Sequence, residues 1–416
     1  MPRTQTFVVF ISIVLAVYSL FQLYVWLSYF RWTRRAIHEG DRHRWQRGGV
    51  WAIIAGNVFF FGTAFSRPLG LSSIPLLRSA VAYAAGFYLA SLVLAFLILI
   101  IRDAIRLPYH VLRRGVELLK RLALSDSTTI PARRPEIDEG RRKFLKVAGV
   151  SAIGVSIATP VVLSLASVRD YKINRVTLRF PNLPGGLRGL RIAQVSDLHA
   201  GPFMTADHLV EIFDLTNSLS AHITLVTGDF VDSTDDEIGS VYDSIGTLKA
   251  DLGVWGCLGN HDHFATAEKV NAALVRRNVR MLNNEHRTVA VNGDSFELIG
   301  VDDYGAGWRN FADPDAAFAG LLPDSFKILM THRPDFFDIA RKAGIDLSLA
   351  GHTHGGQVGF DIGPVKLNPV YLVHKYPMGH FMVEGKQLYV NVGVGMVGAA
   401  IRLVRPELTL FTLEPT

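Results

Sequence analysis

The chain has 416 residues, enough for more than one domain, and its net charge of +6 is unevenly divided. Residues 1–167 hold 21 Lys and Arg against 8 Asp and Glu, a charge of +13, so the remainder carries −7. Because the basic residues alternate with long apolar stretches, they do not form a soluble nucleic-acid-binding arm, and no nucleic-acid partner is expected.

Four apolar stretches in the N-terminal part predict transmembrane helices: Phe7–Phe30, Val50–Phe65, Ala80–Ile101 and the weaker Val147–Val168. None carries an ionisable side chain well inside it, so we expect an anchor rather than a solute pathway. The predicted organisation is three membrane helices in 1–122, a linker in 123–146, a fourth transmembrane or signal-anchor helix in 147–168, and a catalytic domain in 169–416.

Basic residues predict how these helices are oriented. They crowd segments 31–47 and 102–146, whereas the segment between the second and third stretches has only Arg67 and Arg78. Segments rich in Lys and Arg stay in the cytoplasm, which puts everything after the fourth stretch outside it. Gly140–Lys146 is similar to a bacterial twin-arginine export signal. We therefore expect a multi-pass protein of the bacterial cytoplasmic (inner) membrane. Its expected partners are the bilayer and the twin-arginine export machinery, and its catalytic domain is expected on the extracytoplasmic side.

The C-terminal half has the pattern of alternating strands and helices. Short apolar runs predict buried strands at Leu190–Val195, Ile223–Thr227, Gly253–Leu258, Ile328–Met330 and Ile345–Ala350. Helical spacing occurs at Ala206–Ser218, Ala265–Arg277 and Pro334–Ala343. Parallel units followed by hairpins favour an α/β fold with two sheets packed face to face and helices outside. The only cysteine, Cys257, lies in one of the apolar runs, where we expect a buried thiol.

Each of these five strands is followed by side chains of the kinds that bind metals. The candidates are Asp197, His199, Asp229, Asn260, His332, His352 and His354. Open α/β sheets place their sites at the carboxyl ends of strands, so these side chains are expected to meet. Carboxylate, imidazole and amide ligands suit divalent Mn, Fe, Zn or Co. Two such ions side by side can promote attack on a phosphate ester.

The motifs Asp-x-His, Gly-Asp-x-x-Asp, Gly-Asn-His-Asp, a lone His and Gly-His-x-His follow one another in this order. From about residue 173 to the end, the chain therefore resembles the calcineurin-like metallophosphoesterase family. Gly351–Gln357, Gly393–Gly395 and Arg405–Glu407 resemble its bacterial membrane-associated branch. The resemblance implies an α/β fold of the four-layer αββα sandwich type, preceded here by the helical membrane region.

The resemblance also implies two divalent metal ions and roles for particular residues. Asp197, His199 and His354 would hold one ion; Asn260, His332 and His352 would hold the other; Asp229 would bridge both. A hydroxide activated by the two ions would attack phosphorus, and His261 would assist departure of the leaving group or orient the substrate. The carboxylate of Asp232 is expected to orient the His261 ring. We expect Asp-x-His and His-x-His to point both side chains the same way, since alternate residues of an extended segment share a face.

Some motif positions differ from those of known branches of this family, and these differences narrow the range of expected substrates. Ser233 follows Asp232 and Asp262 follows His261, unlike in the Ser/Thr protein phosphatases, and Asp232 stands where purple acid phosphatases need Tyr. We therefore expect a membrane-anchored hydrolase of phosphoester or pyrophosphate bonds in a phosphorylated substrate. A lipid-linked or envelope substrate is the sharper hypothesis, and soluble phosphoesters are the alternative. Two further alternatives are a membrane sensor or scaffold with a non-catalytic metal domain, and a transporter driven by hydrolysis.

Overall fold

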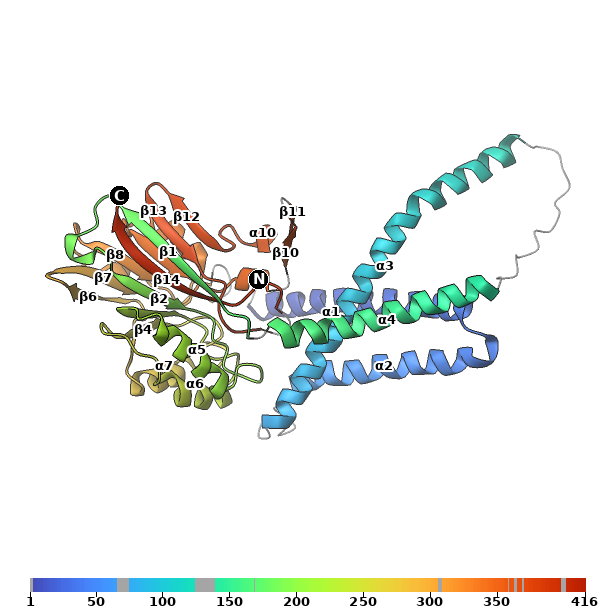
Figure 1. The fold of residues 1–416 in the computed structure, drawn as a ribbon, viewed down its shortest axis with the longest axis horizontal. Coiled ribbons are helices and arrows are strands. Elements are labelled where there is room, and N and C mark those ends of the chain that lie inside the picture. The colour runs from blue at the N-terminus through green and yellow to red at the C-terminus, as the bar shows by residue number, and fades with distance from the viewer. Residues whose placement is uncertain are drawn as a thin grey trace. The chain divides into compact units, whose positions relative to one another are not determined.

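A computed structural model describes residues 3–65, 75–123, 139–167, 169–305, 309–357, 359–362, 365–368, 370–397 and 402–416 (Figure 1). The chain divides into two compact units. Residues 1–70 and 80–162 form the first, which we call the helical unit. Residues 71–79 and 163–416 form the second, the α/β unit, which contains every candidate metal ligand.

Long helices build the helical unit: α1 (Arg3–Ala36), α2 (Glu39–Phe65), α3 (Pro75–Ala123) and α4 (Glu139–Ser167). Within the described residues, two segments are long and apolar enough to cross a membrane, Tyr83–Glu117 of α3 and Glu139–Val162 of α4. The spans expected within α1 and α2 stay predictions. Residues 124–138 of the expected linker lie outside the described residues. Its first residue, Ala123, ends α3, and residues 139–146, with the twin-arginine-like motif, form the first turns of α4.

Two mixed six-stranded sheets form the α/β unit. In the first sheet only the pair of β14 and β2 is antiparallel, and the strand order is β1 (Lys172–Phe180), β14 (Glu407–Pro415), β2 (Arg191–Val195), β3 (Ile223–Thr227), β4 (Val254–Cys257) and β5 (Val279–Met281). The second sheet has antiparallel pairs at both edges, and its order is β12 (Gly379–Val383), β13 (Lys386–Val390), β9 (Leu347–Ala350), β8 (Phe326–Met330), β7 (Asp294–Gly300) and β6 (Glu285–Val291). A separate hairpin pairs β10 (Phe360–Ile362) with β11 (Val365–Leu367).

Short helices lie between these strands. They are α5 (Ala206–Ser218), α6 (Ile238–Ile245), α7 (Ala267–Arg276), α8 (Pro314–Phe318), α9 (Phe337–Ala340) and α10 (Val370–Val373), with 3-10 turns η2 (Gly185–Leu187), η3 (Asp235–Glu237), η4 (Pro334–Phe336) and η5 (His354–Gly356). The predicted bounds of β3 and α5 are those of the structure. The helical spacing predicted over Pro334–Ala343 is confirmed in part: the 3-10 turn η4 and the short helix α9 follow each other over residues 334–340, and the chain reverses at Gly344, whose φ is 82°.

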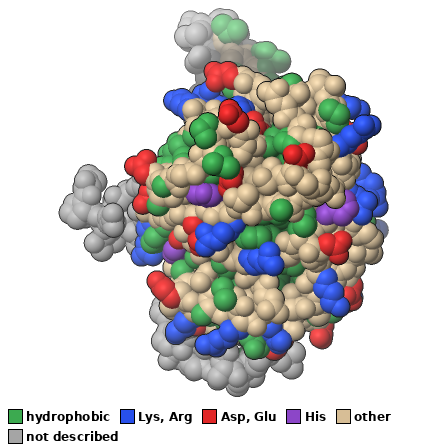
Figure 2. All heavy atoms as spheres, turned by 90° about the vertical axis from the view of Figure 1, so that its left-hand side faces the viewer, with side chains coloured by type: hydrophobic (Ala, Val, Ile, Leu, Met, Phe, Trp, Pro, Cys, Tyr) green, Lys and Arg blue, Asp and Glu red, His purple; other side chains and the backbone are tan. Residues whose placement is uncertain are grey.

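Apolar side chains of both sheets form one buried cluster that includes Ile192, Trp255, Leu298 and Leu349. Cys257 belongs to this cluster and is buried, as predicted. A second cluster joins the first sheet to α5, α6 and α7, which lie along that sheet in Figure 1. A third joins β7 and β8 to α8, η4 and α9. On the face of the α/β unit shown in Figure 2, acidic and basic side chains are interspersed.

The sheets bring the ends of five strands together. β2, β3 and β4 are neighbours in the first sheet, and β8 and β9 are neighbours in the second. Each pair is parallel, so the loops that follow these strands leave from the same edge. Residues from the loops after β3 and β8 meet across the two sheets: the His332 ring bonds the backbone oxygen of Thr227. The candidate ligands therefore gather where the two sheet edges meet.

Candidate metal centre

Backbone conformation at the site differs from the extended segments that the sequence predicted. Asp197, His199 and Asp229 have φ of 55°, 46° and 54°, and His352 and His354 have 73° and 51°. Such left-handed values are unfavourable for residues with a Cβ and concentrate at functional sites. The side chains converge because the loops turn in this way, and the argument from alternating faces of a strand is wrong here.

Asp197, His199 and His354 form a buried triplet. Nε2 of His199 lies 3.0 Å from Nε2 of His354, and Oδ1 of Asp197 lies 3.4 Å from Nε2 of His354 and 3.9 Å from Nε2 of His199. The carboxylate of Asp197 also accepts from the backbone N–H of His352 at 3.0 and 3.2 Å. Three donor atoms thus lie within 4.8 Å of one another, a spacing that could hold a metal ion.

Asp229, His332 and His352 form a second triplet of this kind. Nε2 of His332 lies 3.1 Å from Oδ2 of Asp229 and 3.2 Å from Nδ1 of His352. Nδ1 of His332 donates to the backbone oxygen of Thr227 at 2.9 Å, which leaves Nε2 as the ligand nitrogen. Oδ2 of Asp229 is also 3.5 Å from Nε2 of His199, so this carboxylate lies between the two triplets.

Asn260 supplies the test of whether a cation fits. Its Oδ1 is buried and has no hydrogen-bond partner among the described residues. A buried amide oxygen without a partner costs about 1–3 kcal/mol. A divalent cation would satisfy it, and together the imidazole, carboxylate and amide donors match the ligand types of divalent transition metals. The buried cluster of His and Asp side chains therefore indicates divalent metal binding.

Burial and neighbouring charges shift the pKa values of the candidate ligands in different directions. Burial, together with the positive charge of neighbouring groups, lowers the pKa of His352 and of His354 well below the usual range. Burial opposes ionisation of Asp229 as well, but the nearby imidazoles of His332 and His261 outweigh it and hold the pKa of Asp229 well below its usual value. Burial opposes protonation of His199 and His332 too, but the carboxylates of Asp232 and Asp229 outweigh it and raise their pKa, that of His332 to about 10. Histidine binds a metal as the neutral imidazole, so these two rings would release a proton when an ion binds.

His261 and Asp232 meet, although through different atoms from those expected. Nδ1 of His261 donates to the backbone oxygen of Asp232, while the Asp232 carboxylate lies 3.9 Å from that nitrogen and 3.5 Å from Nδ1 of His199. The backbone carbonyl thus fixes the His261 ring and leaves Nε2 for a substrate. His261 is also close enough to His199 and Asp229 to form a third triplet of possible ligands.

Two residues that hold the site loops were given no role from the sequence. The buried Asp262 carboxylate accepts from the backbone N–H of Phe230 at 2.9 Å, Val231 at 3.2 Å and Gly259 at 2.9 Å. Burial and the charge of Asp229 raise the pKa of Asp262 to about 7. This carboxylate ties the loop after β3 to the loop after β4, and its place beside His261 in the motif was the signal for it.

Arg402 is fully buried and no motif marks it. Its guanidinium donates to the backbone oxygens of Val392, Gly393 and Gly395, at 2.9 Å for Gly393. Gly395 in turn donates its N–H to the backbone oxygen of Asp197 at 2.8 Å. Arg402 therefore fixes the loop that lies against Asp197.

Arg333 is a third residue that the sequence analysis missed. Its Nη1 lies 3.0 Å from Nε2 of His352, and its Nε donates to the Asp303 carboxylate at 2.7 Å. Nε2 of His352 is therefore occupied by a fixed cation, and Nδ1 is the nitrogen that faces the cluster.

Candidate ligands approach the backbone so closely at Gly259 and Gly351 that only glycine fits there. A Cβ on Gly259 would overlap Oδ1 of Asp229, and a Cβ on Gly351 would overlap Oδ2 of Asp197. Any larger residue at these positions would displace a candidate ligand.

Exposed apolar side chains occur at Phe264, beside His261, and in the segment that precedes His374. The ring centroid of His374, a histidine expected to be structural, lies 5.7 Å from that of His352. Its neighbours Leu372 and Val373 are 89% and 74% exposed. Phe264, 49% exposed, packs its ring 4.8 Å from the His261 ring. We call Phe264, Leu372 and Val373 the apolar rim.

Comparison with known proteins agrees with this geometry. Residues 190–356 match the model of the calcineurin-like phosphoesterase family. An uncharacterized metallophosphoesterase of Bacillus subtilis, YkuE, is 30% identical over 285 residues, which cover 66% of this chain and 98% of YkuE. A bovine "transmembrane protein with metallophosphoesterase domain" is 30% identical over 294 residues, which cover 67% of this chain and 64% of that protein. With the two apolar helices, the second likeness indicates membrane association. On these matches, the chain belongs to the calcineurin-like metallophosphoesterase family.

Proposed function

We propose that the chain is a membrane-anchored phosphoesterase that uses two divalent metal ions to hydrolyse phosphoester or pyrophosphate bonds. Family membership implies a hydrolase acting on phosphoester bonds. The observation that carries the proposal is the position of Asp229, whose Oδ2 lies 3.1 Å from Nε2 of His332 and 3.5 Å from Nε2 of His199, so that it contacts residues of both triplets. We assign Asp197, His199 and His354 to one ion and Asn260, His332 and His352 to the other, with Asp229 bridging; the ions are of the Mn, Fe, Zn or Co type.

The residues around the ligands supply orientation and a proton. Bound ions of this kind act as Lewis acids and lower the pKa of water. The Thr227 carbonyl and Arg333 hold the His332 and His352 rings in position. His261, held by the Asp232 carbonyl, keeps Nε2 free to donate a proton to the leaving oxygen.

We also propose the four-layer αββα arrangement and the bacterial membrane-associated branch. Three apolar clusters, one joining the sheets and one joining each sheet to helices, support the first. The twin-arginine-like segment at the start of α4 and the basic residues of segments 31–47 and 102–146 support a multi-pass protein of the inner membrane. In this arrangement the α/β unit is extracytoplasmic, and the twin-arginine machinery is its export partner.

A lipid-linked substrate is the class that we favour. The apolar rim consists of Phe264, whose exposed ring packs against His261, and of Leu372 and Val373, which are exposed and precede His374 in the sequence; a polar substrate would gain nothing from these side chains. Exposed apolar side chains gathered beside a site mark contact with an apolar group. The acyl or isoprenoid part of a lipid phosphate is such a group.

The double variant Leu372→Ser with Val373→Ser tests the rim. Burying both side chains against a lipid stabilises the complex by about 3 kcal/mol, so kcat/KM for a phosphorylated lipid in mixed micelles should fall roughly 100-fold. Turnover of the soluble ester bis(p-nitrophenyl) phosphate should stay unchanged. As a control, Val275→Ser removes an exposed side chain of α7 that is not part of the rim and should leave both rates unchanged. Equal loss on both substrates would refute lipid recognition by the rim.

Metal removal tests the proposed function itself. Full-length protein in detergent, stripped with a chelator, should lose hydrolysis of bis(p-nitrophenyl) phosphate by at least about 1000-fold. Mn²⁺, Fe²⁺, Zn²⁺ or Co²⁺ added singly should restore it, with metal content measured in each sample. Bound metal without turnover of aryl, nucleotide or lipid phosphates would instead support the sensor or scaffold alternative.

A further inference from the structure

A cavity of about 730 Å³ lies inside the helical unit. All four helices line it: α1 from Gln22 to Arg35, α2 at Ala52 and Ile53, α3 from Tyr88 to His110, and α4 from Leu145 to Ile157. At 1.5 Å per residue, the lined part of α1 is about 20 Å long. The cavity is therefore long enough for an extended acyl chain, and none of the metal-site residues belongs to it.

Specific contacts hold the helices around this space. Nε2 of Gln22 donates to Oδ1 of Asn57 and to the Tyr88 hydroxyl, both at 3.0 Å, which joins α1 to α2 and α3. The Trp32 indole N–H donates to the backbone oxygen of Leu145 in α4 at 2.7 Å, and a Cβ on Gly149 would overlap the same ring. These contacts fix the separation of the helices, so the cavity is part of the fold of the unit.

The lining of the cavity is strongly basic. Arg31, Arg35, Arg102 and Arg106 line it, together with His110. The one carboxylate in the lining, Asp103, pairs with Arg102 at 2.7 Å and accepts from the Tyr24 hydroxyl at 2.6 Å. Within the part of the chain that the structure describes, Arg31, Arg35 and Arg106 have no carboxylate partner. The lining thus holds four arginines and one carboxylate, an excess of positive charge.

Small and aliphatic side chains make up much of the remaining lining. Leu92, Ala95, Ile98 and Leu99 contribute from α3, and α4 adds Ala148, Ala152 and Ile153. Such a surface gains free energy only when an apolar group covers it. The small side chains leave the space that such a group would fill.

We propose that this cavity binds an anionic phospholipid, with its phosphate at the arginines and an acyl chain along the apolar wall. Guanidinium groups bind phosphate oxygens in a fork geometry, and basic pockets between membrane helices are suited to anionic headgroups. Inorganic phosphate alone would leave the apolar wall uncovered, and a neutral lipid would leave the arginines unpaired. The bound lipid makes the helical unit a lipid-recognition module and more than an anchor.

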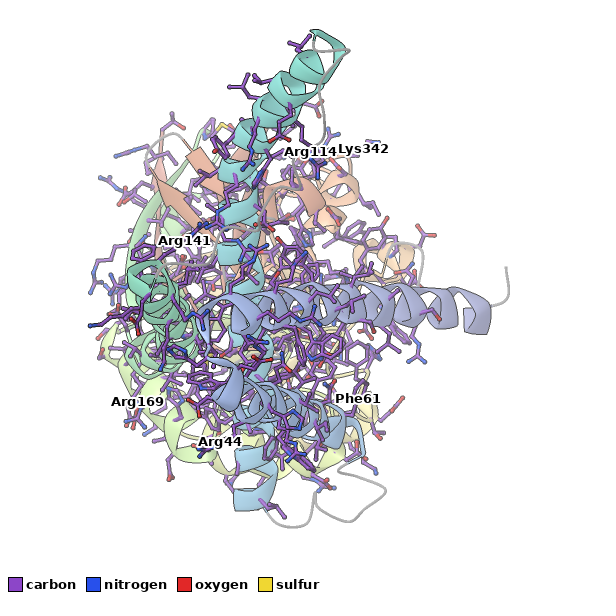
Figure 3. All side chains as sticks on the ribbon, turned by 90° about the vertical axis from the view of Figure 1, so that its right-hand side faces the viewer. Arg44, Phe61, Arg114, Arg141, Arg169 and Lys342 are labelled. Carbon is purple, nitrogen blue, oxygen red and sulfur yellow. The ribbon has the colours of Figure 1, made fainter. Side chains whose placement is uncertain are left out.

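Native mass spectrometry of the full chain in mild detergent tests this binding. With added phosphatidylglycerol, we expect one retained lipid per chain, and no comparable adduct with phosphatidylcholine or inorganic phosphate. The double variant Arg35→Gln with Arg106→Gln should weaken retention roughly 30-fold. The matched control is Arg44→Gln with Arg114→Gln, which removes the same charge from α2 and α3 outside the lining and should retain the lipid; Figure 3 labels both arginines.

A second pair of variants tests the apolar wall. Ala152→Trp fills the cavity and should abolish retention, whereas Ala104→Trp, on α3 outside the lining, should not. Helix content by circular dichroism checks that each variant is folded. Equal retention of the two phospholipids, equal loss in both arginine pairs, or retention by folded Ala152→Trp would each overturn the proposal. The readout is lipid mass, so failure here is distinct from absence of hydrolysis by the metal centre.

Discussion

Replacing Asp229 by Asn should abolish metal-dependent hydrolysis, with a loss in kcat/KM of at least about 1000-fold, or 4 kcal/mol of transition-state stabilisation. The Asp229 carboxylate is 3.1 Å from Nε2 of His332 and 3.5 Å from Nε2 of His199, so no other carboxylate can replace it between the triplets. In the native chain the backbone N–H of His261 donates to Oδ1 of Asp229 at 2.8 Å. The Asn side chain keeps an oxygen that can accept this hydrogen bond, so the loop is preserved. Metal content per chain, measured beside turnover of bis(p-nitrophenyl) phosphate, should fall with activity.

Asp346→Asn is the matched control for this change. Asp346 precedes β9, at the opposite end of that strand from His352, and pairs with Lys386 at 2.7 Å. The same chemical change there should leave metal content and turnover within about twofold. Full activity in Asp229→Asn, or an equal loss in Asp346→Asn, would contradict the assignment of Asp229 as the bridging ligand.

Replacing His261 by Gln should reduce turnover about 100- to 10,000-fold for esters with poor leaving groups, because a positioned general acid contributes that much. For p-nitrophenyl esters the loss should be smaller, since nitrophenolate departs without a proton. The His261 ring is held by the backbone carbonyl of Asp232 and not by its carboxylate. Asp232→Asn should therefore change the dependence of the rate on the leaving group little. The measurement is kcat/KM across a series of alkyl and aryl esters of increasing leaving-group pKa.

Metal content separates the two possible roles of His261. Its ring is also within ligand distance of His199 and Asp229. If His261 is a proton donor, His261→Gln leaves the metal content unchanged. If His261 is a ligand, the variant lowers the metal content as Asp229→Asn does. His286→Gln serves as the control. His286 lies on β6, and its ring bonds the backbone oxygen of Ala317 and no candidate ligand.

The sequence by itself determined which strands precede the ligands and in what order the ligands occur. Buried parallel strands are continuous apolar runs, so β2, β3, β4, β8 and β9 could be recognised without any tertiary information. The α5 helix followed equally from its apolar spacing, with Thr205 as its N-cap. The motifs then named the family, because residue types and their order survive in the sequence.

Tertiary structure alone decided how these residues meet. Oδ1 of Asp197 accepts from the backbone N–H of His352, 155 residues away, and that contact exists only because the two sheets pack face to face and bring their strand ends together. No local pattern encodes the left-handed φ of the ligands, the buried Arg402 or the insertion of β14 between β1 and β2. The basic residues of α1 and α3 were recognised as loop charges, but their common place in the lining of one cavity was not. A periodic pattern reports which side of an element is buried, whereas the partner of that side depends on the packing of the whole unit.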